Sequence, residues 1–485
     1  MKKILLISGI LAALFFSCKE KNDPPPSGKT FKAFNHVNET YYDVKASLLA
    51  HGVYCEIWAE DGSGVDEATA RKVADEYDKI YEMMIKAFSK KNIKDPYDGA
   101  TYPDIMEFAF SLTGEAKVCI LLLDIKDNYK KDVNDSYVAG LFDPVNMLSK
   151  RNYPNSNESV MLYIDTNPLK PGAEMYKTLA HEMQHLMNFA SSFIYRVINN
   201  TLYGMDTWID EGLSSAAEWL YAKQHPADKW IWFNQNGMGN NMKGKIDVGN
   251  NFFVWGNRKS ESPYAVLDDY ATVYLFFQWL RLQSGDSTGI YLDIITSKDP
   301  DYKGVVDVAS AKIYSNNPGN WEGLLRDWLA ANYINADNGL YGYGGDPDLK
   351  KIKAPAVPLG TSTLNLYPGE GIYSLIKDES MPVNGNSSIK YAGLKLDKIS
   401  PEVNDSSTIS NGALLTYNVE TDGKKNSVQT TITGTGVAAS VGIAPSGGRF
   451  TAEPLGPFRI DARDVQMRNG RERSPLPINT IRVVR

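Results

Sequence analysis

The sequence of 485 residues predicts an α+β fold, and three observations indicate it. Two apolar runs, at residues 117–125 and 160–165, have the length and composition of buried strands. They are followed by a helix at 174–194, which is apolar almost all round except for one polar stripe. After residue 360 the composition shifts toward Thr, Ser, Val and Gly, with short alternating runs. That shift is typical of a β-sandwich, so we expect a β-sandwich-like C-terminal domain at 361–485.

The first 17 residues are expected to be a lipoprotein signal peptide. Lys2-Lys3 supplies the charged start, and residues 4–16 form an apolar segment too short to span a bilayer. The segment ends in Ser17-Cys18, which resembles a bacterial lipobox. Cys18 would then become the lipidated first residue of the mature chain and anchor it at the cell envelope. The alternative is an ordinary cleaved signal and a secreted product.

Three further boundaries follow from composition. Residues 18–32 contain three consecutive prolines and are typical of a tether. The main folded domain is expected at 33–349, beginning with strands and a long amphipathic helix that Asp66 can cap. A Lys- and Pro-rich linker is expected at 350–360.

The polar stripe of the helix at 174–194 carries His181-Glu182-Met183-Gln184-His185. Histidines at i and i+4 on a helix direct both imidazoles at one point, which is the spacing of two metal ligands. The chain holds only five histidines, so a chance match is rare. The alternative is a pair of histidines that are hydrogen-bonded in a core.

Glu211 is the candidate third ligand. Thr207 and Asp210 have the form of a capping box, which would start a helix near Trp208 and place Glu211 in its first turn. Gly212 would remove bulk next to the metal. Three polar residues follow on the same helical face: Ser214, Ser215 and Glu218. Three protein ligands leave one position open for water, as in a catalytic zinc site. The alternative is that Glu211 is a surface carboxylate at a helix start.

These motifs resemble the gluzincin metallopeptidases, and most closely the hyicolysin-type neutral metalloproteases of bacteria. The resemblance covers roughly residues 115–285 and also includes the runs at 137–142, 161–166 and 269–276. It implies a zincin-like domain of a small mixed sheet plus helices, with zinc between two lobes. It also implies that 161–164 is the edge strand that holds the substrate backbone.

The same resemblance assigns roles at the site. One zinc ion would be held by His181, His185 and Glu211, with Glu182 as the general base. Apart from the resemblance, Ser215 and Glu218 follow Glu211 on the same helical face, and this position predicts that they support the ligand histidines from behind. The spacing from His185 to Glu211 is longer than in thermolysin-like members, so Glu218 is kept as the reserve ligand.

A tyrosine is expected to stabilise the oxyanion, since no histidine follows His225 in the chain. Tyr270 is chosen because it starts a run that resembles the tyrosine-bearing helix of aminopeptidase-like gluzincins. Tyr264 and Tyr274 remain alternatives. Any one of the three is as readily a packing aromatic.

The net charge, the cysteines and the acidic residues limit which partners, disulfides and further metal sites the sequence allows. A formal net charge of −7 disfavours nucleic acid as a partner. Cys55 and Cys119 permit one disulfide in an exported chain, or two buried thiols. An acidic run is a candidate calcium site, but it lacks EF-hand spacing and is more typical of a solvated loop. Its residues are Asp124, Asp127, Asp132, Asn134 and Asp135.

The sequence therefore predicts a zinc-dependent peptidase, and specifically an endopeptidase lipid-anchored at the cell envelope. Its partners would be a protein or peptide substrate and, through Cys18, a membrane. Two alternatives stay open. One is an aminopeptidase-like exopeptidase, which the absence of a Gly-x-Met-Glu-Asn type run disfavours. The other is a non-catalytic binding lipoprotein with a relict zinc site, which the presence of Glu182 disfavours.

Overall fold

The structure is a computed structural model. It describes residues 28–96, 98–131, 137–198, 201–226, 229–230, 233–234, 252–253, 255, 265–314, 319–354, 356–358, 364–376, 388–395, 402–404, 412–422, 428–430 and 459–461. The expected signal peptide, Cys18 and Tyr264 lie outside these residues. Within the described chain, no helix is long and apolar enough to cross a membrane.

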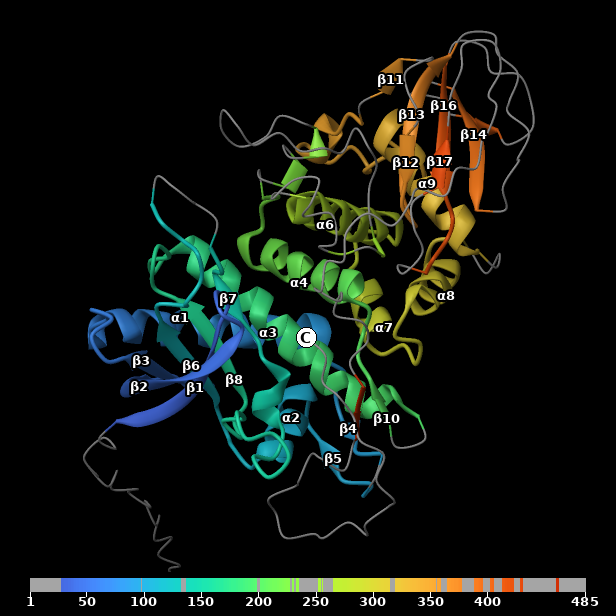
Figure 1. Ribbon diagram of the computed structural model, residues 1–485. Helices are drawn as coiled ribbons and strands as arrows, with labels where there is room; N and C mark the ends of the chain where they lie inside the picture. Colours follow the sequence, from blue (N-terminus) through green and yellow to red (C-terminus); the bar gives the residue numbers. More distant parts are fainter. Residues whose placement is uncertain are drawn as a thin grey trace, which may run out of the picture.

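The N-terminal part of the described chain contains a mixed sheet of six strands (Figure 1). Its strands, in spatial order, are β1 (Lys29–Asn35), β2 (Thr40–His51), β3 (Cys55–Glu60), β6 (Val118–Leu123), β8 (Met161–Asp165) and β7 (Gly140–Leu141). The strands from β1 to β3 pair antiparallel, β3, β6 and β8 run parallel, and β7 is antiparallel to β8. Together with the helices, this sheet confirms the α+β class.

Strand β6 shows why the centre of the sheet is stable. Its side chains alternate between two apolar clusters, with Ile120 and Leu122 on one face and Leu121 and Leu123 on the other. A strand buried on both faces must be apolar throughout, as this sequence is. The helices α1 (Glu67–Phe88), α2 (Ile105–Thr113) and α3 (Ala173–Tyr195) pack with the larger cluster. Asp66 caps α1 by accepting from Thr69 N at 2.7 Å, as the sequence predicts.

The edge of the sheet differs from the prediction. The strand expected at the edge, 161–164, is β8, which lies between β6 and β7. The edge position belongs to the two-residue strand β7, Gly140–Leu141. A strand of two residues is too short to show a periodic pattern in the sequence. The longer apolar run of β8 does show one, and the edge was therefore assigned to it.

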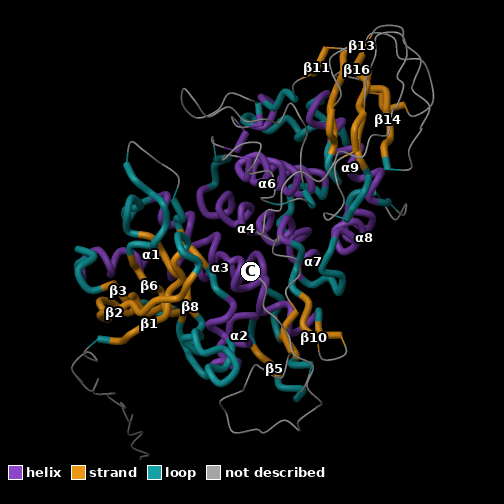
Figure 2. Tube along the Cα trace, in the orientation of Figure 1, coloured by secondary structure: helices purple, strands orange, loops and turns teal. Residues whose placement is uncertain are grey.

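Helices make up the middle of the molecule and lie between two sheets (Figure 2). After α3 they are α4 (Thr207–Ala222), α6 (Ala265–Gln283), α7 (Gly289–Ile295), α8 (Tyr302–Lys312) and α9 (Trp321–Ile334). Helix α4 packs on both α3 and α6. The helices predicted at 174–194 and from about Trp208 are confirmed, but the capping box is not. Asp206 is the N-cap of α4, without a side-chain cap bond, and Thr207 is the first helical residue.

The C-terminal part is β-rich, but a β-sandwich is not confirmed. Its larger described sheet orders β11 (Ala356–Pro358), β13 (Gly371–Ile376), β16 (Gly412–Asn418), β14 (Ile389–Lys395) and β15 (Glu402–Asn404). A separate pair joins β12 (Leu364–Leu366) and β17 (Val428–Thr430). The larger sheet packs against α9, and Tyr373, Leu415 and Tyr417 join the same apolar cluster as the helices.

Two expected linkers contain regular structure. Strand β1 begins at Lys29, so the last residues of the tether expected at 18–32 belong to the first sheet. The linker expected at 350–360 contains β11, which pairs in parallel with β13. Of the two candidate states of Cys55 and Cys119, the structure has the buried free thiols.

Candidate metal centre

Helices α3 and α4 bring three side chains together, with Glu211 one residue beyond the first turn of α4, in which it was expected. The ligand atoms of His181, His185 and Glu211 all lie within 4.8 Å of one another, close enough to share one metal ion. Glu211 Oε2 lies 3.2 Å from His181 Nε2 and 3.6 Å from His185 Nε2. The i, i+4 spacing on α3 aims both imidazoles at α4, and packing of α4 on α3 supplies the carboxylate.

Each histidine is held from behind at its other nitrogen. Glu218 Oε1 lies 2.6 Å from Nδ1 of His181, and Asp210 Oδ2 lies 2.9 Å from Nδ1 of His185. A carboxylate can only accept, so each Nδ1 carries the proton and donates it. Both Nε2 atoms therefore face Glu211, which is the arrangement that orients histidine ligands in metal sites.

Two of these supporting contacts are not predicted from the sequence. Asp210 is expected there only as part of a capping box, and Ser214, whose Oγ lies 3.2 Å from His185 Nδ1, is given no role. Ser215 is expected to support a histidine. Its Oγ is instead buried without a hydrogen-bond partner among the described residues. Neighbouring positions on a helix point 100° apart, so Ser214 and Ser215 cannot both face His185.

The electrostatics of the cluster follow from these contacts. Burial lowers the pKa of His181, but its contacts with the carboxylates of Glu211 and Glu218 outweigh it and raise that pKa to about 9. Burial also lowers the pKa of His185, but the charges of Asp210 and Glu211 raise it well above its ordinary value. Burial acts to raise the pKa of Glu211, yet the two imidazoles hold it well below its ordinary range. The carboxylate is therefore ionised, and a bound cation would displace protons from the imidazoles.

The donor set fits a metal ion. Two imidazole nitrogens and one carboxylate oxygen are the ligands of a catalytic zinc site, which keeps its fourth position open. Glu211 Oε2 is buried and has no hydrogen-bond partner among the described residues. A buried carboxylate oxygen without a donor is costly, and a cation between it and the two Nε2 atoms would satisfy it.

Glu182 lies beside this cluster and is buried, with only 7% of its surface exposed. Burial raises its pKa, while the neighbouring histidines and a hydrogen bond from the backbone of Phe142 lower it. Strand β7 passes directly over it. A Cβ on Gly140 would lie 2.9 Å from Glu182 Cγ and 2.6 Å from Thr178 Cγ2, so this approach requires glycine.

A cavity of about 270 Å³ opens over the cluster. One wall is β7 and the residues after it, including Phe142, and the other is α3 with Phe189. The cavity brings the proposed ligands, the proposed base and one of the three candidate tyrosines to a single space. These lining residues are His181, Glu182, His185, Glu211 and Tyr270.

The three tyrosines that were candidates for the oxyanion donor have different positions relative to the cavity. Tyr270 lines the cavity with its ring centre 6.4 Å from that of His181, and burial followed by the charge of Glu211 raises its pKa well above the ordinary value. A hydroxyl with so high a pKa keeps its proton and is a donor. Tyr274 instead hydrogen-bonds to His225 at 2.6 Å. Tyr264 lies outside the described residues.

Gly212 has a different role from the one expected beside the metal. A Cβ at this position would clash with the ring of Phe277 on α6. The glycine therefore lets α6 approach α4, and its absent side chain makes room for an aromatic ring. The sequence shows a glycine next to Glu211, but the ring that needs the space is far along the chain.

The acidic run offers no metal cluster in its described part. Asp127 accepts backbone hydrogen bonds from Tyr129 and Val138, and Asp124 accepts from the side-chain amide of Asn167. These are loop-forming contacts. Three of the residues expected at a calcium site, Asp132, Asn134 and Asp135, lie outside the described residues.

Fold and cluster together define a class: an α+β protein whose HExxH helix and following helix build a candidate single-metal centre. No family model matches the chain. The chain is similar to the neutral metalloprotease ShpI of Staphylococcus hyicus, at 26% identity over 359 residues, which are 72% of this chain and 72% of that protein. The predicted relationship to bacterial neutral metalloproteases is thereby confirmed, and it supports a peptidase, and so a hydrolase, function.

Proposed function

We propose that this protein is a zinc-dependent endopeptidase of the bacterial cell envelope. The observation that carries the proposal is the convergence of His181, His185 and Glu211 next to Glu182 in one cavity. A site that only stabilised the fold would need the ligands but not the carboxylate beside them. The intact Glu182 therefore favours chemistry over a relict binding site.

The candidate metal ligands, Glu182 and Tyr270 each have a role in peptide hydrolysis. Zinc, when bound, would polarise a peptide carbonyl and lower the pKa of water. Glu182 takes the proton of the attacking water and returns it to the leaving amine. Burial raises its pKa, so this carboxyl binds a proton more readily than an exposed glutamate does before it passes the proton on. The Tyr270 hydroxyl donates to the oxyanion that develops on the substrate.

Strand β7 supports an endopeptidase over an exopeptidase. It ends the described sheet and lines the cavity next to Glu182. An extended peptide can add to such an edge through backbone hydrogen bonds, with both of its ends continuing beyond the cavity. An exopeptidase would need a charged group that clasps one terminus of the substrate.

The test combines metal content with casein cleavage. The purified protein should hold about one zinc per chain, cleave casein into internal fragments, and lose activity to a chelator until zinc is restored. His181→Ala should contain no zinc and cleave nothing. Trimming of single residues from a free amino terminus would favour the exopeptidase, and zinc without any hydrolysis would favour the binding lipoprotein.

The envelope location is a separate part of the proposal and rests on the lipobox-like Ser17-Cys18. A lipid on Cys18 would keep the protein in the membrane fraction. Cys18→Ala should move it to the soluble fraction with zinc content and casein cleavage unchanged. Membrane retention of that variant would contradict the lipid anchor.

A further inference from the structure

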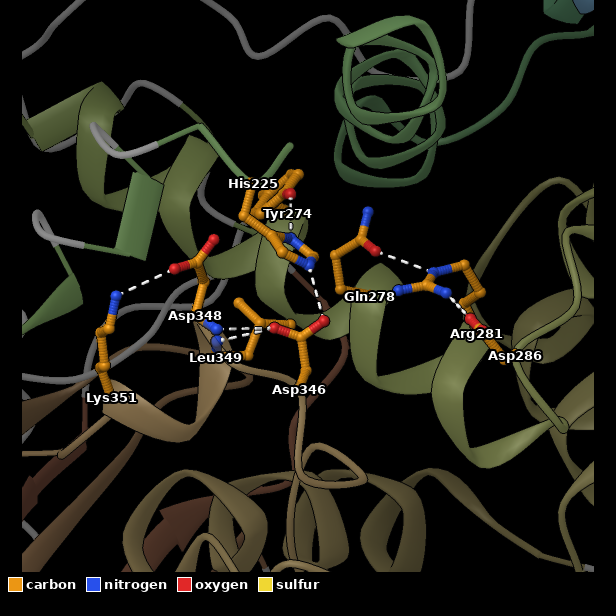
Figure 3. A network of polar contacts seen from close by, with 9 residues as sticks. All are labelled: His225, Tyr274, Gln278, Arg281, Asp286, Asp346, Asp348, Leu349 and Lys351. Atoms are coloured by element: carbon orange, nitrogen blue, oxygen red, sulfur yellow. Dashed lines mark hydrogen bonds and ion pairs between the residues drawn. The ribbon is translucent and has the colours of Figure 1, made fainter. Parts of the chain in front are cut away.

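A chain of hydrogen bonds connects residues outside the cavity, next to α6 (Figure 3). His225 is at its centre, with 6% of its side chain exposed. Its Nδ1 lies 2.6 Å from the hydroxyl of Tyr274, and its Nε2 lies 3.1 Å from Oδ2 of Asp346. Nothing in the proposed chemistry uses these three residues.

The donor in each bond follows from the groups involved. Burial acts to raise the pKa of Asp346, but the bond to His225 and two backbone bonds hold it at about 2. The carboxylate is ionised and can only accept, so His225 Nε2 donates to it. Nδ1 is then the acceptor, and the Tyr274 hydroxyl donates to it. A single tautomer of His225 satisfies both neighbours.

At the other end of this series of hydrogen bonds, backbone amides hold the carboxylate of Asp346. Oδ1 of Asp346 accepts from the amides of Asp348 at 2.9 Å and Leu349 at 3.0 Å. Figure 3 shows these two bonds converging on the same carboxylate that holds His225. Asp346 is therefore held in one orientation, which makes it a firm support for the imidazole.

At its Tyr274 end, this series of hydrogen bonds contacts α4 and α6, which both contribute residues to the cavity. Tyr274 lies four residues after Tyr270 on α6, so the two share one helical face. His225 follows the end of α4 at Ala222, and its ring stacks on Trp219 of α4 at 6.0 Å between ring centres. The chain thus joins α4, which carries Glu211, to α6, which carries Tyr270.

We infer that Tyr274, His225 and Asp346 are positioning residues, which hold α6 in register with α4 and thereby set the Tyr270 hydroxyl at the cavity. This inference rests on the proposed function. An oxyanion donor acts only in the transition state, so a small displacement of Tyr270 should lower kcat and leave KM nearly unchanged.

Tyr274→Phe tests the inference by removing one oxygen atom from the end of the chain. We expect zinc content to stay at the wild-type level, kcat for a peptide substrate to fall about tenfold, and KM to stay within about twofold. Tyr291→Phe is the matched control. Its hydroxyl is also buried and also bonds to α6, at Phe277 O, but it belongs to α7 and has no part in the chain. Its kcat should match that of the wild type.

A double-mutant cycle separates positioning from a general loss of stability. If Tyr274 acts through Tyr270, then Tyr274→Phe should change kcat less than about twofold in a Tyr270→Phe background. Asp346→Asn breaks the chain at its other end and should show the same dependence on Tyr270. An unchanged kcat in the single variants, or equal losses in both backgrounds, would overturn the inference. If the wild type cleaves no peptide, the proposed function fails and the inference falls with it.

Discussion

Two carboxylates outside the HExxH motif decide which nitrogen of each histidine faces the candidate metal centre. Asp210 and Glu218 each accept from an Nδ1, which leaves both Nε2 atoms directed at Glu211. The three carboxylates of α4 therefore have different roles. Glu211 meets the Nε2 atoms, while Asp210 and Glu218 hold the rings from behind. This division explains how one short helix can supply both a candidate ligand and the supports of the other two candidate ligands.

Substitution of the two glutamates should separate these roles. Glu211→Ala removes a ligand and should abolish measurable zinc affinity. Glu218→Ala leaves all three ligands and should weaken zinc binding by about 10–100-fold, as for other supports of ligand histidines. Zinc titration against a competing chelator measures both variants. A greater loss in Glu218→Ala would make that residue the third ligand.

The residues of the site differ in how far the sequence could predict them. The cluster of His181, His185 and Glu211 is predictable because helical spacing fixes two of its members and the third lies near the start of the next helix. The pairing of His185 with Asp210 depends on how α4 is rotated against α3, which no spacing within either helix specifies. The same rotation places Ser214, rather than Ser215, at His185.

At the scale of elements, the close approach of β7 to α3 shapes the cavity. The strand crosses above Glu182 at Gly140, where a Cβ would meet Glu182 and Thr178 at 2.9 Å and 2.6 Å. The backbone of Phe142, just beyond the strand, hydrogen-bonds to the same carboxylate. The edge of the sheet therefore both closes one wall of the cavity and orients the proposed base.

Gly140→Ala should disturb this approach without touching a metal ligand. The added methyl must displace the strand or the Glu182 side chain, so we expect casein cleavage to fall about 10²-fold. Zinc content should stay at the wild-type level. Gly323→Ala on α9 is the control, because its Cβ would make only an ordinary contact of 3.4 Å with Asn320, and its activity should be unchanged. Full activity in Gly140→Ala would show that β7 does not set Glu182.

A buried carboxyl near the same edge should make stability depend on pH. Burial raises the pKa of Asp143 to about 6, although Val145 N and Tyr41 donate hydrogen bonds to it. Because its folded pKa is raised, Asp143 favours the folded state fully below pH 3.8, and this contribution is lost as the pH rises through about 6. Ionisation of this group should therefore cost up to about 3 kcal/mol at neutral pH.

Asp143→Asn should remove this pH-dependent cost while it keeps the shape of the side chain. Relative to the wild type, the variant should gain free energy of unfolding between about pH 4.5 and about pH 7.5. Urea denaturation at the two pH values measures the difference. A constant offset between variant and wild type at both pH values would mean that Asp143 does not titrate in this window.

In the molecule as a whole, the candidate metal centre lies where the first sheet with its helices meets helices α4 and α6. The strands at 117–125 and 160–165 and the helices after Asp66, at 174–194 and from Trp208 were predictable, because long apolar strands and amphipathic helices have clear periods. The two-residue strand β7 carries no such signal. The C-terminal composition correctly indicated strands, but composition does not specify whether they pack on a second sheet or, as here, on a helix such as α9.

We propose that Glu182 is a base beside a zinc ion and not a ligand of it. Glu182→Gln tests this most directly, because the amide keeps the shape of the side chain and cannot accept the proton. We expect about one zinc per chain in this variant, as in the wild type, with casein cleavage reduced by about 10²–10⁴-fold. A fully zinc-loaded Glu182→Gln protein with wild-type cleavage would contradict the claim, as would a variant that is folded but empty of zinc.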